Sequence, residues 1–273
     1  CHHQLCYQEV RVQLKSLGDS IDEVGQPPKT LLLINLTDTA AAPQVDALER
    51  VFESASVTVA DRQLSEGQRD LVCLVEEGDV VATSPWAELK ESFLLVNSDR
   101  YRTGTKAIEN EAFPDVLTKL DDIEFTVRGY PESNKEKLLL ILISRFIEFR
   151  ALSHGSGEFD ASFQYLSRLD DELGTQRVYE WLAESAVDTH VYGIRDDPSV
   201  VTELPVEIHA DRSPELRRLW FVVFQPPATV SAASPHGPVA LIAEETETNV
   251  WRGLWTYDAD RVQRVQSYVR EAF

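Results

Sequence analysis

Three short, mainly apolar runs constrain the fold of this 273-residue chain more than any other feature. They occupy residues 30–36, 219–224 and 239–243, and each is far shorter than a membrane-spanning helix. Short apolar runs bounded by turn residues are typical of strands that are covered on both faces. Such strands need helices on both sides, so the chain is predicted to fold as a layered α/β protein.

The order of the patterns predicts two lobes, each a small mixed sheet with helices. Residues 1–29 are an N-terminal segment of uncertain structure, and residues 30–134, where strand and helix patterns alternate, form an N-terminal α/β lobe. Residues 135–273 form the second lobe, which begins with the longest helical pattern. Much of the first half of that helix is apolar all round, apart from Arg145 and Glu148, so it is predicted to lie between two layers.

The second lobe is predicted to continue with two helices and to end in an antiparallel three-strand meander plus helix. The predicted helices cover 163–173 and 175–186, the strands 187–194, 206–209, 219–224, 239–243 and 250–257, and the last helix 258–273. Asp258 is the predicted N-cap of that last helix, whose valines repeat at helical spacing.

The charge of the chain excludes several classes of partner. It carries 26 basic and 46 acidic residues, a net charge of −20, which argues against binding nucleic acid or an anionic membrane through the general surface. Only 7 of the basic residues are Lys, and all of them precede Leu138. Uniform acidity with few lysines predicts a halophilic protein whose self-repulsion is screened by salt, the alternative being an ordinary acidic protein. We expect a cytoplasmic location, because neither a signal peptide nor a membrane-length apolar run is present.

Motifs of known chemistry are missing from the sequence. It has no phosphate-binding glycine loop, no His-Glu-x-x-His, no Cys-x-x-Cys and no Gly-x-Ser-x-Gly. Cys1, His2, His3 and Cys6 could in principle supply zinc ligands, but without a second Cys/His cluster we expect an unstructured end there. Cys73 lies in an apolar strand pattern and is predicted to be buried. We therefore assign no catalytic residue, no metal site and no cofactor from the sequence.

Two strands carry side chains that could line a ligand pocket. Alternation places Asp188, His190 and Tyr192 on one face of the strand 187–194. It also places Trp251, Trp255 and Tyr257 on one face of the strand 250–257. Aromatic rings with polar tips can hold a flat ligand by stacking, so His190, Tyr192, Trp251, Trp255 and Tyr257 are the candidate ligand-binding residues. The alternatives are an exposed sheet face for His190 and an ordinary core for the aromatic residues.

Four segments of the second lobe resemble the DICT sensory domain family, which is named for its occurrence with diguanylate cyclases and two-component systems. The resemblance covers about 135–273 and is carried by Lys137-Leu138-Leu139-Leu140 to Ser144-Arg145-Phe146-Ile147-Glu148, Val187-Asp188-Thr189-His190-Val191-Tyr192-Gly193, Trp220-Phe221-Val222-Val223-Phe224 and Trp251-Arg252-Gly253-Leu254-Trp255-Thr256-Tyr257-Asp258. The first half is similar to the N-terminal half of single-chain DICT proteins of halophilic archaea. The resemblance implies sensing and supplies no ligand or catalytic residue, and this chain carries no recognisable kinase, cyclase or DNA-binding domain.

These observations together predict a non-enzymatic sensory or regulatory protein that acts in signal transduction. Its expected partner is a small-molecule ligand or a signalling protein, with a homodimer as one arrangement. The alternatives are a hydrolase-type enzyme that uses carboxylates and a structural adaptor. An enzyme should show a perturbed acid or histidine in a cleft with a partner within hydrogen-bond reach, whereas a sensor should show an aromatic-lined cavity without one. An adaptor should show a large flat apolar patch.

Overall fold

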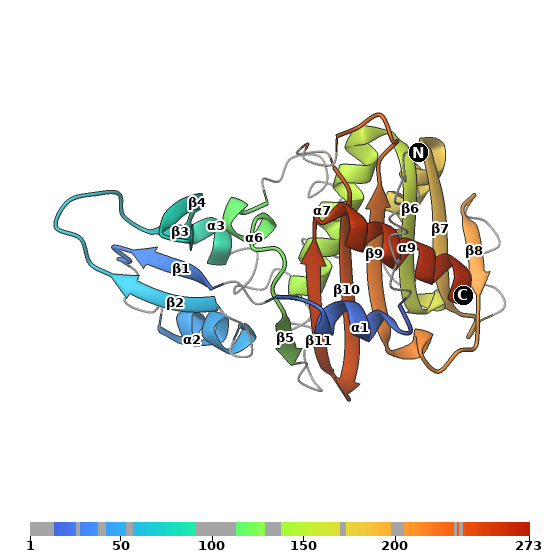
Figure 1. Cartoon of the computed structure of the whole chain (residues 1–273), viewed down its shortest axis with the longest axis horizontal. Helices are drawn as coiled ribbons and strands as arrows, with labels where there is room; N and C mark the ends of the chain where they lie inside the picture. The colour runs from blue at the N-terminus through green and yellow to red at the C-terminus, as the bar shows by residue number, and fades with distance from the viewer. Residues whose placement is uncertain are drawn as a thin grey trace, which may run out of the picture.

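The structure is a computed structural model that describes residues 14–25, 28–37, 42–52, 57–90, 113–128, 138–169, 173–197, 205–231, 234 and 237–273. Within these residues it is a mixed α/β protein with two mixed sheets, as the sequence predicted (Figure 1). The pattern at residues 1–6 lies outside the described part of the chain.

The larger sheet has seven strands and holds most of the second half of the chain. Its strands lie in the order β5 (Phe125–Arg128), β11 (Val250–Thr256), β10 (Val239–Glu247), β9 (Leu219–Gln225), β6 (Ser156–Tyr165), β7 (Ala186–Ile194) and β8 (Glu207–Ala210). The strands β9, β10 and β11 form the predicted antiparallel meander. The strands β6, β7 and β8 run parallel to one another, so β8 is a parallel edge strand.

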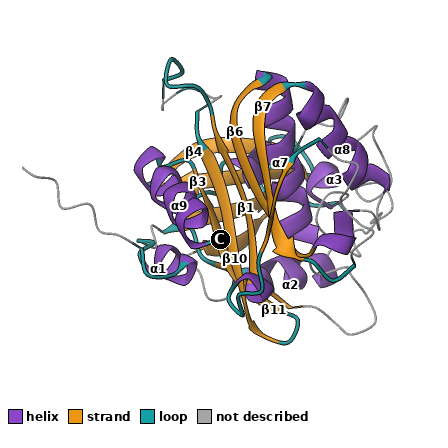
Figure 2. Cartoon of the chain, turned by 90° about the vertical axis from the view of Figure 1, so that its right-hand side faces the viewer, coloured by secondary structure: helices purple, strands orange, loops and turns teal. Residues whose placement is uncertain are grey.

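Helices cover both faces of this sheet (Figure 2). One face carries α7 (Leu138–His154) and α8 (Leu173–Glu184), and the other carries α1 (Leu17–Asp22) and α9 (Ala259–Ala272). Asp258 caps α9 as predicted, because its side chain accepts a hydrogen bond from the Arg261 backbone N–H. The apolar β9 and β10 runs therefore belong to strands covered on both faces, which is the condition that the sequence analysis expected of them.

The smaller sheet comes from the first third of the chain. Its strand order is β2 (Val57–Arg62), β1 (Lys29–Ile34), β3 (Leu71–Glu76) and β4 (Asp79–Pro85), with the helices α2 (Ala42–Val51), α3 (Trp86–Leu89) and α6 (Asp115–Thr118). Glu77 and Gly78 connect β3 to β4 as predicted, and both have positive φ angles, of 52° and 95°. Two positive φ angles in a row are what a tight two-residue hairpin requires, and Gly supplies one of them without strain.

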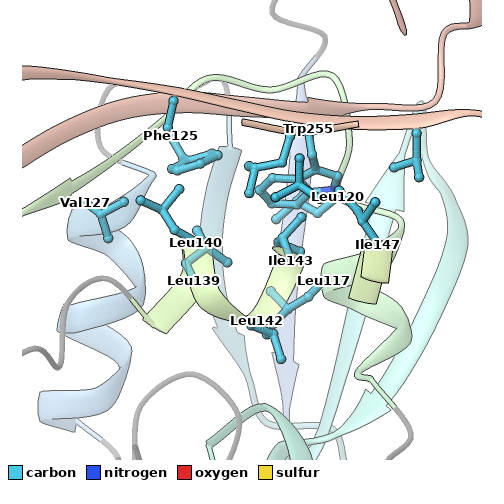
Figure 3. Packing of buried hydrophobic residues seen from close by; sticks show 14 of the residues in the cluster. Leu117, Leu120, Phe125, Val127, Leu139, Leu140, Leu142, Ile143, Ile147 and Trp255 are labelled. Carbon is cyan, nitrogen blue, oxygen red and sulfur yellow. The ribbon is translucent and has the colours of Figure 1, made fainter. Parts of the chain in front are cut away.

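A single buried cluster joins the two sheets. It runs from Leu31 and Leu33 of β1 through the apolar residues of α7 to Trp251 and Trp255 of β11. Figure 3 shows side chains of α6 and α7 packed between the strands of the two sheets. The prediction that the longest helix lies between two layers is therefore confirmed, and its all-round apolar surface is explained by contacts on both sides.

Two sequence-based assignments of elements differ from the structure. Residues 163–173, predicted as a helix, instead contain the end of β6, the short 3₁₀ helix η3 (Leu166–Leu169) and the start of α8. β6 was not predicted at all: it starts at Ser156, directly after Gly155, which ends α7 with a φ of 72°. The strand β5 pairs with β11, although its sequence position placed it in the N-terminal lobe.

None of the helices in the described part of the chain is long and apolar enough to span a bilayer.

Candidate functional site

The structure does not bring the five predicted ligand-binding residues together. Trp251 and Trp255 lie on the α7 face of the larger sheet, in the cluster that joins the two sheets. Tyr192 belongs to the separate cluster on the α1 and α9 face. Three strands separate β11 from β7 in the sheet. The five residues therefore do not line a single pocket, and a binding role for each of them stays a prediction.

The aromatic residues of β11 are core residues. The side chains of Trp251 and Trp255 are fully buried, and the Trp255 ring packs 5.4 Å from that of Phe125. Tyr257 is partly buried, and its hydroxyl donates to the Thr118 carbonyl. These aromatics pack beneath α7 and not beneath α9, because their strand positions face the junction between the sheets.

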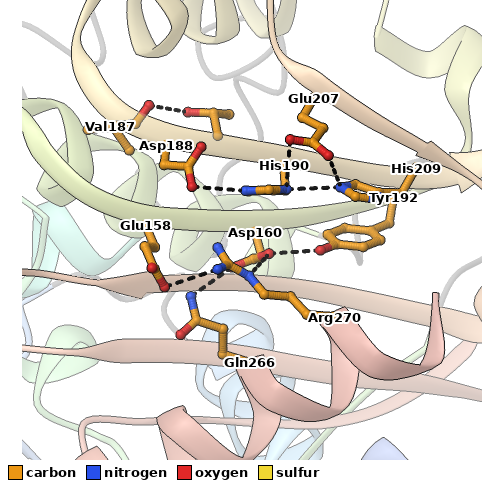
Figure 4. Close-up of polar contacts among 11 residues, drawn as sticks. Glu158, Asp160, Val187, Asp188, His190, Tyr192, Glu207, His209, Gln266 and Arg270 are labelled. Atoms are coloured by element: carbon orange, nitrogen blue, oxygen red, sulfur yellow. Dashed lines mark hydrogen bonds and ion pairs between the residues drawn. The ribbon is translucent and has the colours of Figure 1, made fainter.

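His190 and Tyr192 belong to a polar network on the opposite face (Figure 4). His190 Nε2 lies 3.1 Å from Asp188 Oδ2, and His190 Nδ1 lies 2.9 Å from Nε2 of His209 on β8. The His209 ring stacks on the Tyr192 ring with centroids 4.5 Å apart. Burial, followed by the neighbouring His190, lowers the pKa of the His209 imidazole.

A fully buried carboxylate continues this network toward α9. Asp160 accepts a hydrogen bond of 2.9 Å from the Tyr192 hydroxyl and another of 2.9 Å from the Gln266 amide. It also accepts two hydrogen bonds from the Arg270 guanidinium, of 3.0 and 3.1 Å. Burial and the adjacent Asp160 together raise the pKa of the Tyr192 hydroxyl. The hydroxyl therefore stays protonated and donates to Asp160.

A pocket lies on the opposite face of the larger sheet, between α7, α8 and the strands β6 and β9. Its volume is about 110 Å³, and it is partly open to solvent. The lining residues are Ile141, Ser144, Arg145, Glu148, Ser162, Phe163, Gln164, Arg168, Thr175, Tyr179, Leu219, Trp220 and Val222. An apolar cavity of about 150 Å³ holds a molecule the size of benzene, so this pocket suits a small molecule or the end of a larger one.

A buried ion pair forms part of the pocket wall. Arg145 Nη1 lies 2.6 Å from Glu148 Oε2, and Arg145 Nη2 donates to the Thr175 hydroxyl at 2.6 Å. The Tyr179 hydroxyl points at the other oxygen of Glu148 from 3.5 Å. One helical turn separates Arg145 from Glu148 on α7, so both side chains project from the same side of the helix.

The environment of Glu148 perturbs its acidity. Desolvation raises the pKa of the Glu148 carboxyl above its usual range, although the Arg145 cation acts in the opposite direction. Burial also raises the pKa of the Tyr179 hydroxyl well above its ordinary value, and the Glu148 charge adds to that effect. A buried acid of raised pKa in a pocket, with a charged partner in hydrogen-bond reach, is what the sequence analysis required of an enzyme.

The remaining polar groups of the pocket are held by hydrogen bonds. Trp220 Nε1 donates to the Ser144 hydroxyl at 3.0 Å, and Ser144 donates to the Leu140 carbonyl at 2.8 Å. Arg168 donates to the Gln164 side chain at 2.8 Å. Two arginines and one glutamate line the pocket, so its wall carries a net positive charge within a chain of net charge −20.

The sequence indicates part of this pocket but not its function. Arg145 and Glu148 interrupt an apolar helix that was predicted to lie between two layers, and charged residues at such positions must be paired. Glu207 and His209 lie in a short predicted strand, to which no site was assigned. A single carboxylate such as Glu207 is no signal of a site in a chain of this acidity. Asp160 was missed because β6 itself was missed.

Comparison with known proteins adds little to this description. No protein-family model and no curated protein matches the sequence. Among solved structures, a weak similarity is found to the crystal structure of polyphosphate kinase from Porphyromonas gingivalis, with a TM-score of 0.33 and 8% sequence identity. That similarity covers 92% of this chain and 47% of the kinase chain, so the chain spans about half the length of that protein.

The predicted function as a non-enzymatic sensory protein is withdrawn. A sensor was expected to show an aromatic-lined cavity without a perturbed acid, whereas this pocket contains Glu148, a buried acid of raised pKa with Arg145 in hydrogen-bond reach. At this TM-score the similarity transfers no activity to the chain. The correction therefore goes no further than withdrawing the sensory prediction, and the resemblance to the DICT family stays untested.

Proposed function

We propose that this protein is a hydrolase-type enzyme whose active site is the pocket between α7, α8 and the larger sheet. The observation that carries the proposal is Glu148, a fully enclosed acid of raised pKa that lines a partly open pocket. An acid whose pKa lies closer to neutrality is a more effective general base when it is ionised. Arg145 and the Tyr179 hydroxyl both lie in hydrogen-bond reach of Glu148 and give it a defined orientation, and the Thr175 hydroxyl in turn holds Arg145.

The charges of the pocket indicate the class of substrate. Arg145 and Arg168 exceed the single carboxylate of Glu148, so the pocket attracts a small anion although the rest of the surface repels one. A substrate that carries its own carboxylate and a hydrolysable ester fits both the charge and the small volume. Arg168, which is only partly buried, is placed to bind the carboxylate.

The reaction requires only groups already in the pocket and water. Ionised Glu148 accepts a proton from a water molecule, and the water oxygen forms a bond to the ester carbonyl carbon. The negative charge that develops on the carbonyl oxygen is stabilised by the Arg145 cation, which acts strongly because Arg145 itself is buried. When the tetrahedral intermediate collapses, the ester C–O bond breaks. The leaving alcohol then takes the proton from Glu148, and a carboxylic acid and an alcohol are released.

A pair of isosteric variants tests the role of Glu148. We expect the protein to hydrolyse 4-nitrophenyl hydrogen succinate faster than buffer, and Glu148→Gln to lower kcat by about 100-fold or more, the usual contribution of a general base. Glu180→Gln changes an exposed carboxylate of α8 in the same way and should leave kcat unchanged. Circular dichroism establishes that both variants are folded. Turnover at the wild-type rate in folded Glu148→Gln, or none above buffer in the wild type, refutes the proposal.

Two further measurements separate binding from chemistry. Arg168→Ala should raise KM for the anionic ester with little change in kcat, and should not affect neutral 4-nitrophenyl acetate. The rate should fall as the pH drops through the raised pKa of Glu148, because only the ionised carboxylate accepts a proton. In Glu148→Gln this fall should disappear.

A further inference from the structure

The edge of the larger sheet gathers three metal-ligating side chains on the face opposite the pocket. His190 comes from β7, and Glu207 and His209 come from the edge strand β8. In the parallel register His190 pairs with Glu207, while Tyr192 pairs with His209. Residues two apart on a strand share a face, so the register alone brings both imidazoles and the carboxylate to one side of the sheet.

The three ligand atoms are close enough to bind one ion. His190 Nδ1 lies 2.9 Å from His209 Nε2 and 3.8 Å from Glu207 Oε2, and His209 Nε2 lies 3.7 Å from Glu207 Oε1. Around a tetrahedral zinc ion with bonds of roughly 2.0–2.2 Å, ligand atoms are about 3.3–3.5 Å apart. The two Glu207 distances run to different carboxylate oxygens, and with one ligand atom from each residue the three atoms lie within 4.8 Å of one another. Side-chain rotations that move these atoms by roughly an ångström bring them to the tetrahedral spacing.

Neighbouring groups orient both imidazoles toward this point (Figure 4). Asp188 accepts from His190 Nε2 at 3.1 Å, so the lone pair of His190 is on Nδ1 and faces His209 and Glu207. The His209 ring is held flat against Tyr192, with an interplanar angle of 12°, and the Tyr192 hydroxyl is held by Asp160. A carboxylate that fixes the tautomer of a ligating histidine is a regular feature of metal sites in proteins.

We propose that His190, Glu207 and His209 bind a zinc-type divalent transition-metal ion that clamps the edge strand β8 to β7. Two imidazoles with one carboxylate favour such ions over Mg²⁺ and Ca²⁺, which prefer oxygen ligands alone. Three protein ligands leave a fourth position, and the exposed side chains of Asp188 and Glu207 place it toward solvent. The sequence analysis assigned no metal site, and this cluster departs from that expectation.

Titration with Zn²⁺ by calorimetry tests the site directly. The protein is first treated with a chelator, and Cys1 and Cys6 are replaced by Ser so that their thiols cannot bind the ion. We expect one Zn²⁺ ion per chain and a higher thermal midpoint with the ion bound, because an ion that binds only the folded state stabilises it. Co²⁺ should give d–d absorption bands without a thiolate charge-transfer band.

Four variants on that Ser-substituted background assign the ligands. Asp188→Asn should weaken Zn²⁺ binding by about 10- to 100-fold, the usual effect of removing an outer carboxylate. His209→Ala and Glu207→Gln should weaken it at least as much. His154→Ala removes an imidazole at the end of α7 and should leave the affinity unchanged.

Two results would overturn the metal site. One is a titration without a saturable 1:1 step. The other is an unchanged affinity in His209→Ala and Glu207→Gln, which would place any bound ion on other carboxylates. Glu207→Gln keeps the shape of an exposed side chain, so the comparison stands even if His209→Ala does not fold. Because the cluster and the pocket lie on opposite faces, loss of the metal site leaves the hydrolase proposal untouched.

Discussion

Replacing Asp160 by Asn measures what the buried carboxylate between β6, β7 and α9 contributes to stability. The change keeps the side-chain shape but removes the charge that faces Arg270 and puts an N–H where a carboxylate oxygen now accepts hydrogen bonds. Tyr192 and Gln266 also donate to this carboxylate, and Tyr192 is fully buried. Breaking a buried ion pair from one side costs about 3–5 kcal/mol. The Arg270 side chain is 29% exposed and can reach water, so we expect about 3 kcal/mol, near the lower end of that range.

Glu158 provides a matched control on the same strand. It pairs with the same Arg270 at 3.1 Å, but its side chain is 46% exposed. Screening by solvent should reduce the cost of Glu158→Gln to below about 1 kcal/mol. Urea unfolding at fixed KCl measures both variants. With an m-value of about 3 kcal/mol/M, Asp160→Asn should shift the midpoint by about 1 M. Equal midpoints for the two variants would refute the argument that burial of Asp160 makes the difference.

Three further predictions follow from burial and charge. Cys73 is buried, and burial raises the pKa of its thiol. In a variant with Cys1 and Cys6 changed to Ser, a thiol reagent should therefore label the native protein slowly. Rapid labelling would contradict the placement of β3. Trp255→Ala should destabilise the protein by about 3–5 kcal/mol. Trp255→Phe should cost less, because the buried indole N–H of Trp255 has no hydrogen-bond partner among the described residues that would be lost. Equal losses of stability for the two variants in urea unfolding would disprove this. The thermal midpoint should rise between about 0.1 M and about 1 M KCl as the screening length falls from about 10 Å to about 3 Å, and a flat curve would remove the halophilic interpretation.

The sequence predicted the elements whose patterns are unambiguous. The apolar runs are interior strands of the two sheets, as predicted, and the long apolar helix lies between the sheets. The meander and the last helix were also correct. β6 was missed because its apolar Phe163 lies three residues from Leu166 and so starts a helical spacing. The same segment alternates strictly, with Phe159, Ala161 and Phe163 apolar and Asp160 and Ser162 polar between them, which is the strand pattern that holds in the structure.

The candidate sites were harder to predict, because they depend on contacts between distant parts of the chain. The pKa of Glu148 is raised mainly by its burial, and Arg145 and then Tyr179, which is 31 residues away, act in the opposite direction. Local sequence patterns reveal neither the burial nor the contact with Tyr179. His190 and His209 meet only because β7 and β8 are parallel neighbours. The sequence does not show whether His190 and Trp255 converge, because alternation predicts the face of a strand but not the order of strands in the sheet.

The position of α1 on the larger sheet has a consequence for synthesis in the cell. This helix packs on β10 and α9, and Arg252 reaches back to Asp22 across 230 residues of sequence. On a ribosome that adds about 5–20 residues per second, α1 emerges roughly 10–50 s before the elements that cover it. During that time the apolar side chains of Leu17, Ile21 and Val24 lack the contacts with β10 and α9 that later bury them. Until those elements are made, the nascent chain therefore exposes a short apolar segment, which is too short to be a stable helix by itself.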